Sequence, residues 1–340
     1  MPDNSDPSLT DERYYIDQFK SFPNVKINYI TAPDKGFFSD LEKFQNKIHF
    51  PNLISRHYLN AAFADAARQS GSRVILDGGG GEMSVSFHGA GGYAELFKNF
   101  QWQTLLHELK CGKKLTGGPL LSDIYSNVLR PLISLKTFKK VTTDAAYLSE
   151  KSEHCLQTSI EEKLKARWEP RKLELNRLTP EVSSSHRVNL ANQIRRVQTK
   201  ARGKADFGIV EIRFPLLDKD LLEFCLAAPL KFKIRNGYKR YTVRAGLNGI
   251  LPPEIQWRTT KGPFSPDYRT RYQAQLPEVR SFLNSISAAD PVRQIVDVEK
   301  LKTLTNPAIR PGELPEKIIR DVVPEGIYLI HFLRRFPEYR

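Results

Sequence analysis

The sequence RVILDGGGGE, from Arg73 to Glu82, decides what fold we expect of this chain. Residues 73–76 form a short apolar run typical of a strand that is covered on both faces in a parallel sheet. Four successive glycines lose much backbone entropy on folding, so a chain keeps them where a ligand or another backbone approaches closely. A loop after a buried parallel strand lies at the carboxyl edge of the sheet, where nucleotides usually bind. Composition alone favours a flexible surface turn equally well.

The elements upstream of this loop fit the same kind of sheet. We expect a helix over residues 11–20, a strand over 25–30 that ends at the turn-forming residues 32–36, and a second helix over 58–69. Helix, strand, helix, strand is the element order of a parallel α/β sheet. Two parallel strands do not make a stable sheet, so further strands are expected from elsewhere.

Downstream of the glycines the pattern becomes helical. Apolar residues recur at spacings near three and four from Tyr93 onward, and residues 110–119 look like a connector. Further helical segments are broken at 179–185 and 262–266, and a final helix is expected to restart after Pro324 and pack in the core. We therefore expect an incomplete α/β nucleotide-binding portion over residues 1–110 and a mainly helical portion over 111–340.

Composition limits the class of protein. The chain has 340 residues, 40% of them hydrophobic and 26% charged, which is enough for a sizeable core and excludes collagen, low-complexity disorder and a disulfide miniprotein. No apolar run approaches the roughly 18 residues of a membrane span, and the polar start is unlike a secretory signal. Three widely spaced cysteines support neither a disulfide framework nor a CxxC metal site, so we expect a cytoplasmic protein.

The charge balance favours an anionic ligand. Lys and Arg outnumber Asp and Glu by 52 to 38, which gives a net charge of +14. Such a charge attracts nucleic acid, anionic lipid, or a nucleotide with its pyrophosphate. The densest basic stretch, residues 195–204, lacks the interleaved aromatics that stack bases, so we interpret it as a solvated helix face and do not expect a nucleic-acid partner.

Two common phosphate-binding motifs do not explain the glycines. The sequence holds no GxxxxGK[ST] loop. Residues 89–94 fit the loose GxGxx[GA] pattern, but no expected strand precedes them and no acidic residue follows at the required distance. We interpret that match as chance.

Residues 208–218 form the second informative segment. Pro215 is expected to fix a turn, and Asp218 is placed to cap a helix over 219–227. Arg213 is close enough in sequence to pair with a neighbouring carboxylate. We interpret this segment as structural.

Four cations between residues 240 and 261 form the third. Arg240 and Arg244 are four apart, on one face of an expected helix, and Arg258 and Lys261 lie in a following loop. These side chains either clamp a pyrophosphate or are simply solvated.

Taken in order, these segments resemble the synthetase domain of the asparagine synthetase family. They read LDGGGGE over 76–82, GxxExRxPxLD over 208–218, RYxxRxxxxGxLP over 240–252 and RxxKxxF over 258–264. The family includes glutamine-dependent asparagine synthetases, β-lactam synthetases and lasso-peptide macrolactam cyclases, and the chain looks closest to the last branch and other asparagine-synthase-related proteins. The resemblance implies an α/β fold of the adenine-nucleotide alpha-hydrolase-like (PP-loop) type, followed by a mainly helical lobe.

The resemblance also implies an activity, ATP-dependent amide synthesis with Mg²⁺. A substrate carboxylate attacks the α-phosphate of ATP to give an acyl-adenylate, and an amine donor, a small molecule or a peptide, then displaces AMP. By resemblance Lys261 and Arg240 are the catalytic residues and Glu82 is the metal ligand. The residues that would contact the nucleotide are Asp77, Gly78, Gly79, Gly80 and Arg244.

Several positions depart from the family pattern. Gly79 stands where relatives carry a catalytic Glu or Tyr, Glu82 replaces an Asp, and Met83 replaces an acidic residue. The family's SGGxDS pyrophosphate loop and its glutaminase domain are absent from the sequence. We therefore expect a truncated or split synthetase that is inactive until a partner chain or a longer reading frame supplies the missing segment, and a partner chain is also the expected source of a glutaminase. The alternatives are a lasso-type macrolactam cyclase and a non-catalytic member that binds a nucleotide or a partner.

Overall fold

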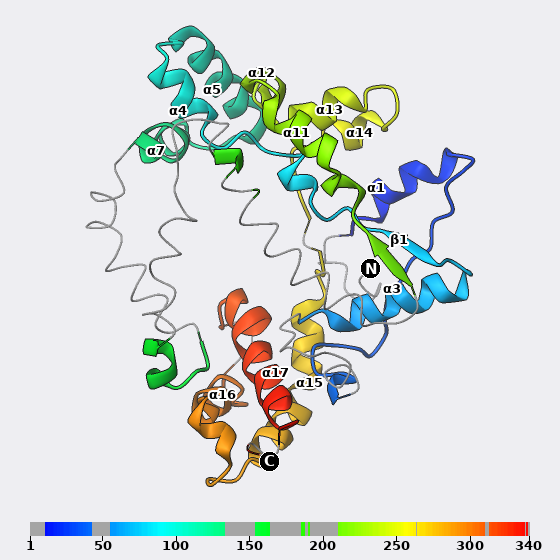
Figure 1. Cartoon of the computed structure of the whole chain (residues 1–340), viewed down its shortest axis with the longest axis vertical. Helices are drawn as coiled ribbons and strands as arrows, with labels where there is room; N and C mark the ends of the chain where they lie inside the picture. The colour runs from blue at the N-terminus through cyan, green and yellow to red at the C-terminus, as the bar shows by residue number, and fades with distance from the viewer. Residues whose placement is uncertain are drawn as a thin grey trace.

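The computed structural model describes residues 11–42, 55–132, 154–163, 185–187, 190, 210–262, 264–309, 313–336 and 338. Figure 1 shows two groups of helices, with α4, α5 and α12 at one end of the view and α15, α16 and α17 at the other. The basic stretch at 195–204, interpreted as a solvated helix face, and residues 179–184 of the predicted helix break lie outside the described residues.

Most of the described chain is helical. The helices of the first half are α1 (Arg13–Asp17), α3 (His57–Gln69), α4 (Gly92–Lys98), α5 (Trp102–Thr116), α6 (Leu120–Ile124) and α7 (Arg130–Leu132). Those of the second half are α11 (Lys219–Ala227), α12 (Leu230–Lys233), α13 (Tyr241–Gly246), α14 (Pro253–Gln256), α15 (Tyr268–Asn284), α16 (Val298–Leu304) and α17 (Val323–Leu333). Short tight or wide turns join them at η1 (Gln18–Ser21), η2 (Gly81–Met83), η3 (Tyr125–Leu129), η4 (Pro215–Leu217), η5 (Pro291–Gln294) and η6 (Ile318–Val322).

The strand before the glycines forms, but it is not buried. β1 (Val74–Leu76) pairs in parallel with β2 (Glu211–Arg213), with Val74 opposite Glu211 and Leu76 opposite Arg213. The side chain of Leu76 is 69% exposed, so the prediction of a strand covered on both faces is wrong. The described chain is compatible with an α/β class, whereas the PP-loop fold itself stays a prediction.

The strand predicted over residues 25–30 is wrong. These residues form an irregular loop after η1, and the backbone groups just beyond them do not pair with a strand. Instead, the guanidinium of Arg271 donates hydrogen bonds to the carbonyl oxygens of Thr31, Ala32 and Lys35. A side chain from α15 therefore satisfies the carbonyl groups of the turn that follows residues 25–30.

The predictions made from local signals hold. Asp218 caps α11, accepting a hydrogen bond from the Leu221 amide at 3.1 Å, and Arg213 pairs with Glu211 at 2.8 Å. The second predicted helix is α3. The predicted connector over 110–119 is wrong for most of its length, because α5 continues to Thr116 and ends at Gly117 in the left-handed conformation that favours glycine. The division of the chain at residue 110 stays a prediction.

The final helix is confirmed, with one difference. Pro324 lies in the first turn of α17, and the π-helical turn η6 leads directly into that helix, so the helix does not restart after the proline. α17 packs with α15 and α16 around the larger hydrophobic core, which also includes Phe37, Leu41 and Cys155. A smaller core lies at the other end of Figure 1 between α4, α5, η3 and strand β3 (Ile234–Arg235).

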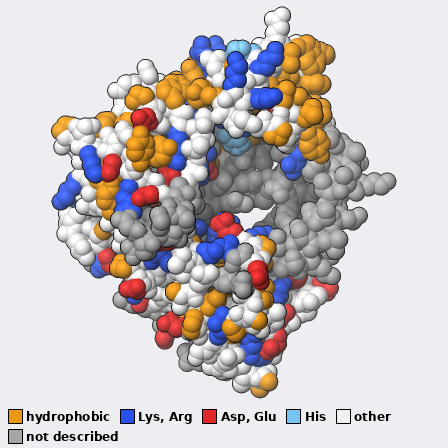
Figure 2. All heavy atoms as spheres, turned by 180° about the vertical axis from the view of Figure 1, so that it is seen from behind, with side chains coloured by type: hydrophobic (Ala, Val, Ile, Leu, Met, Phe, Trp, Pro, Cys, Tyr) orange, Lys and Arg blue, Asp and Glu red, His pale blue; other side chains and the backbone are white. Residues whose placement is uncertain are grey.

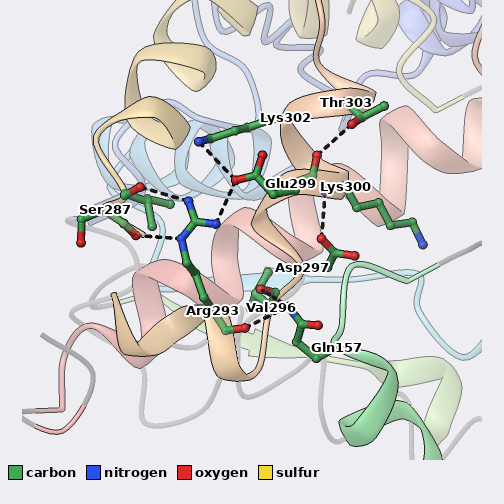
Figure 3. A network of polar contacts seen from close by, with 10 residues as sticks. Gln157, Ser287, Arg293, Val296, Asp297, Glu299, Lys300, Lys302 and Thr303 are labelled. Atoms are coloured by element: carbon green, nitrogen blue, oxygen red, sulfur yellow. Dashed lines mark hydrogen bonds and ion pairs between the residues drawn. The ribbon is translucent and has the colours of Figure 1, made fainter. Parts of the chain in front are cut away.

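A polar network joins residues 155–157 to the C-terminal helices (Figure 3). Arg293 pairs with Glu299 at 2.9 Å and donates to the Ser287 carbonyl at 2.7 Å. The Gln157 amide donates to the Arg293 carbonyl at 2.9 Å, and Asp297 caps α16 by accepting from the Lys300 amide. These contacts fix η5 and α16 against a segment more than a hundred residues earlier in the chain.

Exposed apolar side chains gather on the helices from α4 to α7. They are Phe100, Trp102, Leu106, Leu121, Tyr125, Leu129 and Leu132. Figure 2 shows hydrophobic side chains grouped at this end of the molecule. Among the residues that the structure describes, no helix has both the length and the apolar character needed to cross a bilayer.

Candidate active site

One cavity of about 540 Å³ brings together three segments that are far apart in sequence. Glu82 reaches it from η2, Arg240 from the end of strand β4 (Tyr238–Lys239), and Lys261 from the loop after α14. Side chains of α4, α5 and α6 form another part of its wall. The resemblance predicted that Glu82, Arg240 and Lys261 share a site, and the cavity brings all three together.

The charges of these three side chains meet at one carboxylate oxygen. Glu82 Oε1 lies 3.4 Å from Nη2 of Arg240 and 3.8 Å from Nζ of Lys261. Lys261 is 78% exposed and Glu82 is 62% exposed, so both pairs are screened by water and contribute little to stability. A polyphosphate would compete well for the two cations, because it offers more negative charge than one carboxylate.

A tight hairpin positions Arg240. β3 (Ile234–Arg235) and β4 are joined by Asn236 and Gly237, which both have positive φ angles, as a two-residue type I′ turn requires. A Cβ at Gly237 would lie 2.3 Å from the backbone nitrogen of Gly112, so the turn packs directly on α5. Glu108 of α5, 7% exposed, accepts hydrogen bonds from the amides of Asn236 and Gly237 at 3.0 and 2.7 Å.

An ion pair from the start of the described chain positions the Lys261 loop. Arg258 donates two hydrogen bonds to the carboxylate of Glu12, at 2.6 and 2.7 Å, and its guanidinium lies 3.7 Å from the ring centre of Tyr15. The hydrogen bonds from Arg258 lower the pKa of the Glu12 carboxyl. A Cβ at Gly262 would collide with Glu12, so this glycine permits the close approach.

Arg244 lines the cavity but its hydrogen bonds go to the backbone. Its guanidinium donates to the carbonyl oxygens of Lys239, Gln256 and Arg258. Burial lowers its pKa. The arginine predicted as a nucleotide contact thus connects β4 to the loop that carries Lys261, and its direct contact with a nucleotide stays a prediction.

The glycine tetrad packs against the turn η4, which follows strand β2. A Cβ at Gly80, whose φ is +94°, would lie 2.3 Å from Leu217, and one at Gly79 would lie 3.1 Å from the ring of Phe214. Asp77 accepts a hydrogen bond from the Gly79 amide at 2.7 Å. Asp77, Gly78, Gly79 and Gly80 do not line the cavity, so their contact with a nucleotide stays a prediction.

A buried pair of side chains, Lys233 and His186, contacts the backbone of η2. Lys233 is 2% exposed, its Nζ lies 3.3 Å from Nδ1 of His186, and burial lowers its pKa. His186 stacks on Phe87 with ring centres 3.9 Å apart, and its Nε2 contacts the Met83 carbonyl. If the Lys233 ammonium donates to Nδ1, then the proton on Nε2 is donated to Met83, which holds the turn that carries Glu82.

Sequence reasoning missed several residues that build the site. His88 and Lys239 line the cavity, and burial, together with the nearby cations Lys239 and Arg240, lowers the pKa of His88. The dipeptide Asn236-Gly237 is a strong hairpin signal that could have placed Lys239 on a strand that leads to Arg240. Glu12 and Glu108 carry no local signal.

Glu82 fits a phosphate-bridged Mg²⁺ better than a protein cage. No group of three or more His, Cys, Asp or Glu side chains forms a metal site within the described ranges. Mg²⁺ usually keeps several waters and takes one or two carboxylates together with substrate phosphates. One carboxylate beside two cations matches that second arrangement.

Comparison with known proteins identifies the family. A family model for asparagine synthase matches residues 37–316. Searches of curated proteins and of solved structures found no match. The matched range covers most of the chain and contains Glu82, Arg240 and Lys261. The chain belongs to the asparagine synthase family.

Proposed function

We propose that this chain is an ATP-dependent carbon–nitrogen ligase that uses the cavity at Glu82, Arg240 and Lys261. A substrate carboxylate oxygen forms a bond to the α-phosphorus of ATP, and the bond from that phosphorus to the bridging oxygen breaks, which releases pyrophosphate. An amine nitrogen then forms a bond to the acyl carbon as the bond to AMP breaks. The asparagine synthase family carries out amide ligation with ATP.

One observation carries the proposal: two cations from separate segments converge on the same cavity as Glu82. Negative charge grows on the leaving pyrophosphate, so fixed cations at that point stabilise the transition state more than the ground state. Lys261 presents a compact charge and Arg240 a planar fork, which together suit the several oxygens of a polyphosphate. The hairpin and the Glu12–Arg258 pair hold the backbone segments that carry both cations before any ligand arrives.

Mg²⁺ would supply further neutralisation of phosphate charge when it is bound, and Glu82 is the residue that would hold it. Without Mg²⁺, Glu82 only repels the triphosphate and competes for its cations. We therefore expect Glu82→Gln to raise ATP affinity in EDTA and to lower it in Mg²⁺. A substitution that acts in the same direction under both conditions would contradict the metal role.

Calorimetric titration of ATP tests the proposal. Arg240→Met and Lys261→Met are each expected to weaken binding about tenfold, the effect of losing one charge-assisted hydrogen bond. Lys219→Met on α11, where the lysine is 83% exposed, is the matched control and should leave ATP affinity unchanged. The proposal is overturned if Arg240→Met and Lys261→Met bind ATP as tightly as the unsubstituted chain and the Lys219→Met control.

A non-catalytic, nucleotide-binding role is the second candidate, and a specific observation favours it. Gly79 stands where relatives carry a catalytic side chain, and it packs against Phe214 rather than facing the cavity. The next departure, Met83, is 3% exposed and has become part of the core. ATP–pyrophosphate exchange with a panel of amino acids and peptides separates the two roles: exchange supports the ligase, and ATP binding without exchange supports the alternative.

A further inference from the structure

We propose that the end of the cavity at Asp123 binds the amine substrate, and that this substrate is a primary amine on an aliphatic body rather than ammonia. The inference rests on the proposed function, because amide formation requires an amine. It assigns a role to a part of the cavity wall that the nucleotide site does not use.

The cavity has two chemically different walls. The hairpin and the following loop contribute the cations Lys239, Arg240 and Lys261. The helices α4, α5 and α6 contribute Tyr93, Leu109 and Leu115 together with the carboxylate of Asp123. The first wall suits a polyanion, and the second suits a molecule with an apolar body and one positive charge.

Asp123 differs from the other acid on the cavity wall. Glu82 is paired with Arg240 and Lys261. No ion pair joins Asp123 to another side chain in the part of the chain that the structure describes. Asp123 is half-buried in the first turn of α6. A carboxylate in that setting gains most from a cation that arrives with the ligand.

The surroundings of Asp123 strengthen such a pair. Leu109 is 6% exposed and belongs to the smaller core, and Leu115 is half-buried on the same helix. The hydroxyl of Tyr93 stays protonated, because burial and the negative charges of Glu108 and Asp123 raise its pKa to about 12. Apolar neighbours lower the local dielectric and so increase the attraction between carboxylate and ammonium.

The apolar wall selects a longer amine over ammonia. Each methylene that the ligand buries strengthens binding about fourfold, whereas ammonium has no apolar surface to bury. In the second half-reaction the ammonium first loses a proton to water, and the lone pair of the resulting amine then forms the C–N bond to the acyl carbon. The C–O bond to AMP breaks with its electron pair, and the nitrogen loses a second proton to water.

Calorimetric titration with n-hexylamine tests the inference, with hexanoate, ethylamine and ammonium chloride as comparison ligands. Hexylamine should bind more tightly than the other three. Asp123→Asn should weaken hexylamine binding about tenfold, the effect of one charge-assisted contact. Asp220→Asn is the matched control, because Asp220 is an exposed aspartate in the first turn of α11, outside the cavity, and it should have no effect.

A second variant keeps the test decisive if Asp123→Asn perturbs the fold. Leu115→Ala should weaken hexylamine binding severalfold and leave ethylamine binding unchanged, since the shorter chain does not cover Leu115. The inference is overturned if Asp123→Asn binds hexylamine as tightly as the unsubstituted chain. If Asp123→Asn does not fold, the same result for Leu115→Ala overturns it. It is also overturned if ammonium binds the unsubstituted chain as tightly as hexylamine does.

ATP titration of the same variants separates this inference from the proposed function. Asp123→Asn with normal ATP affinity and weakened amine binding supports both. Normal ATP affinity with unchanged hexylamine binding overturns the amine site alone. If ATP does not bind while Asp123→Asn still weakens hexylamine binding, the proposed function fails and the amine site stands.

Discussion

Replacement of Glu108 should loosen the hairpin that carries Arg240. The carboxylate of Glu108 accepts the amide protons of Asn236 and Gly237 from a buried position. Each hydrogen bond to a charged group is worth ~1.5 kcal/mol or more, so Glu108→Ala should lower the free energy of local opening by about 3 kcal/mol. At 1.4 kcal/mol for each factor of ten, this equals a roughly hundredfold loss of amide protection.

Hydrogen exchange followed by mass spectrometry measures this loss in the peptide that spans residues 234–240. Glu108→Gln should give an intermediate loss, because one side-chain oxygen remains as an acceptor. Glu223→Ala on α11, where the glutamate is 66% exposed, is the control and should leave the peptide unchanged. Unchanged protection of residues 234–240 in Glu108→Ala would refute the role assigned to Glu108, and ATP affinity should fall in parallel with the protection.

Three further predictions concern the glycine loop and two carboxyl groups. Gly80→Ala should lower the free energy of unfolding by about 2 kcal/mol, because the new Cβ would collide with Leu217 at a position with positive φ. Gly78→Ala, whose Cβ would meet nothing within 4 Å, should lower it far less. Equal urea midpoints for the two variants would contradict this packing. Arg258 lowers the pKa of the Glu12 carboxyl below its ordinary 4.5. The free energy of unfolding that Glu12→Gln loses should therefore be constant above pH 5 and shrink as the pH falls through the folded-state pKa. A loss of stability that does not change with pH would contradict this pairing. Burial raises the pKa of Glu325 from 4.5 to about 7, so between these pH values the folded chain keeps this carboxyl protonated while the unfolded chain ionises it, and the free energy of unfolding falls as the pH rises from 4.5 to 7. Glu325→Gln should therefore add ~2 kcal/mol to the free energy of unfolding at pH 8 and nothing at pH 4. Glu316→Gln is the exposed control, and no gain at pH 8 would exclude this effect.

Predictions from sequence succeeded where the physical cause lies within a few residues. The Asp218 cap, the limits of α11 and the Arg213–Glu211 pair all depend on groups two or three positions apart. The apolar pattern of α3 is likewise local. Such signals survive folding because few distant contacts compete with them.

The failures lie beside long-range contacts. The turn after residues 25–30 is held by Arg271, from more than 230 residues away, whereas nothing in the structure explains why residues 25–30 themselves form no strand. Residues 110–119 were expected to form a connector, yet Gly112 lies inside α5, where the missing side chain lets the Gly237 turn approach the helix. Local propensity does not report either contact.

The candidate site shows the same division. Glu82, Arg240 and Lys261 were identified by resemblance, and the cavity brings them together. Glu12 and Glu108, which hold the two cationic segments, lie 246 and 128 residues from their partners. Their side chains have no distinctive neighbours in sequence, so only the folded chain reveals them.

A crystal structure with a non-hydrolysable ATP analogue and Mg²⁺ tests the central claim most directly. We predict that the triphosphate lies between Arg240 and Lys261, with phosphate oxygens about 2.7–3.2 Å from both side chains and Glu82 on the same side of the cavity. An analogue bound elsewhere, with Arg240 and Lys261 still paired to Glu82, would contradict it.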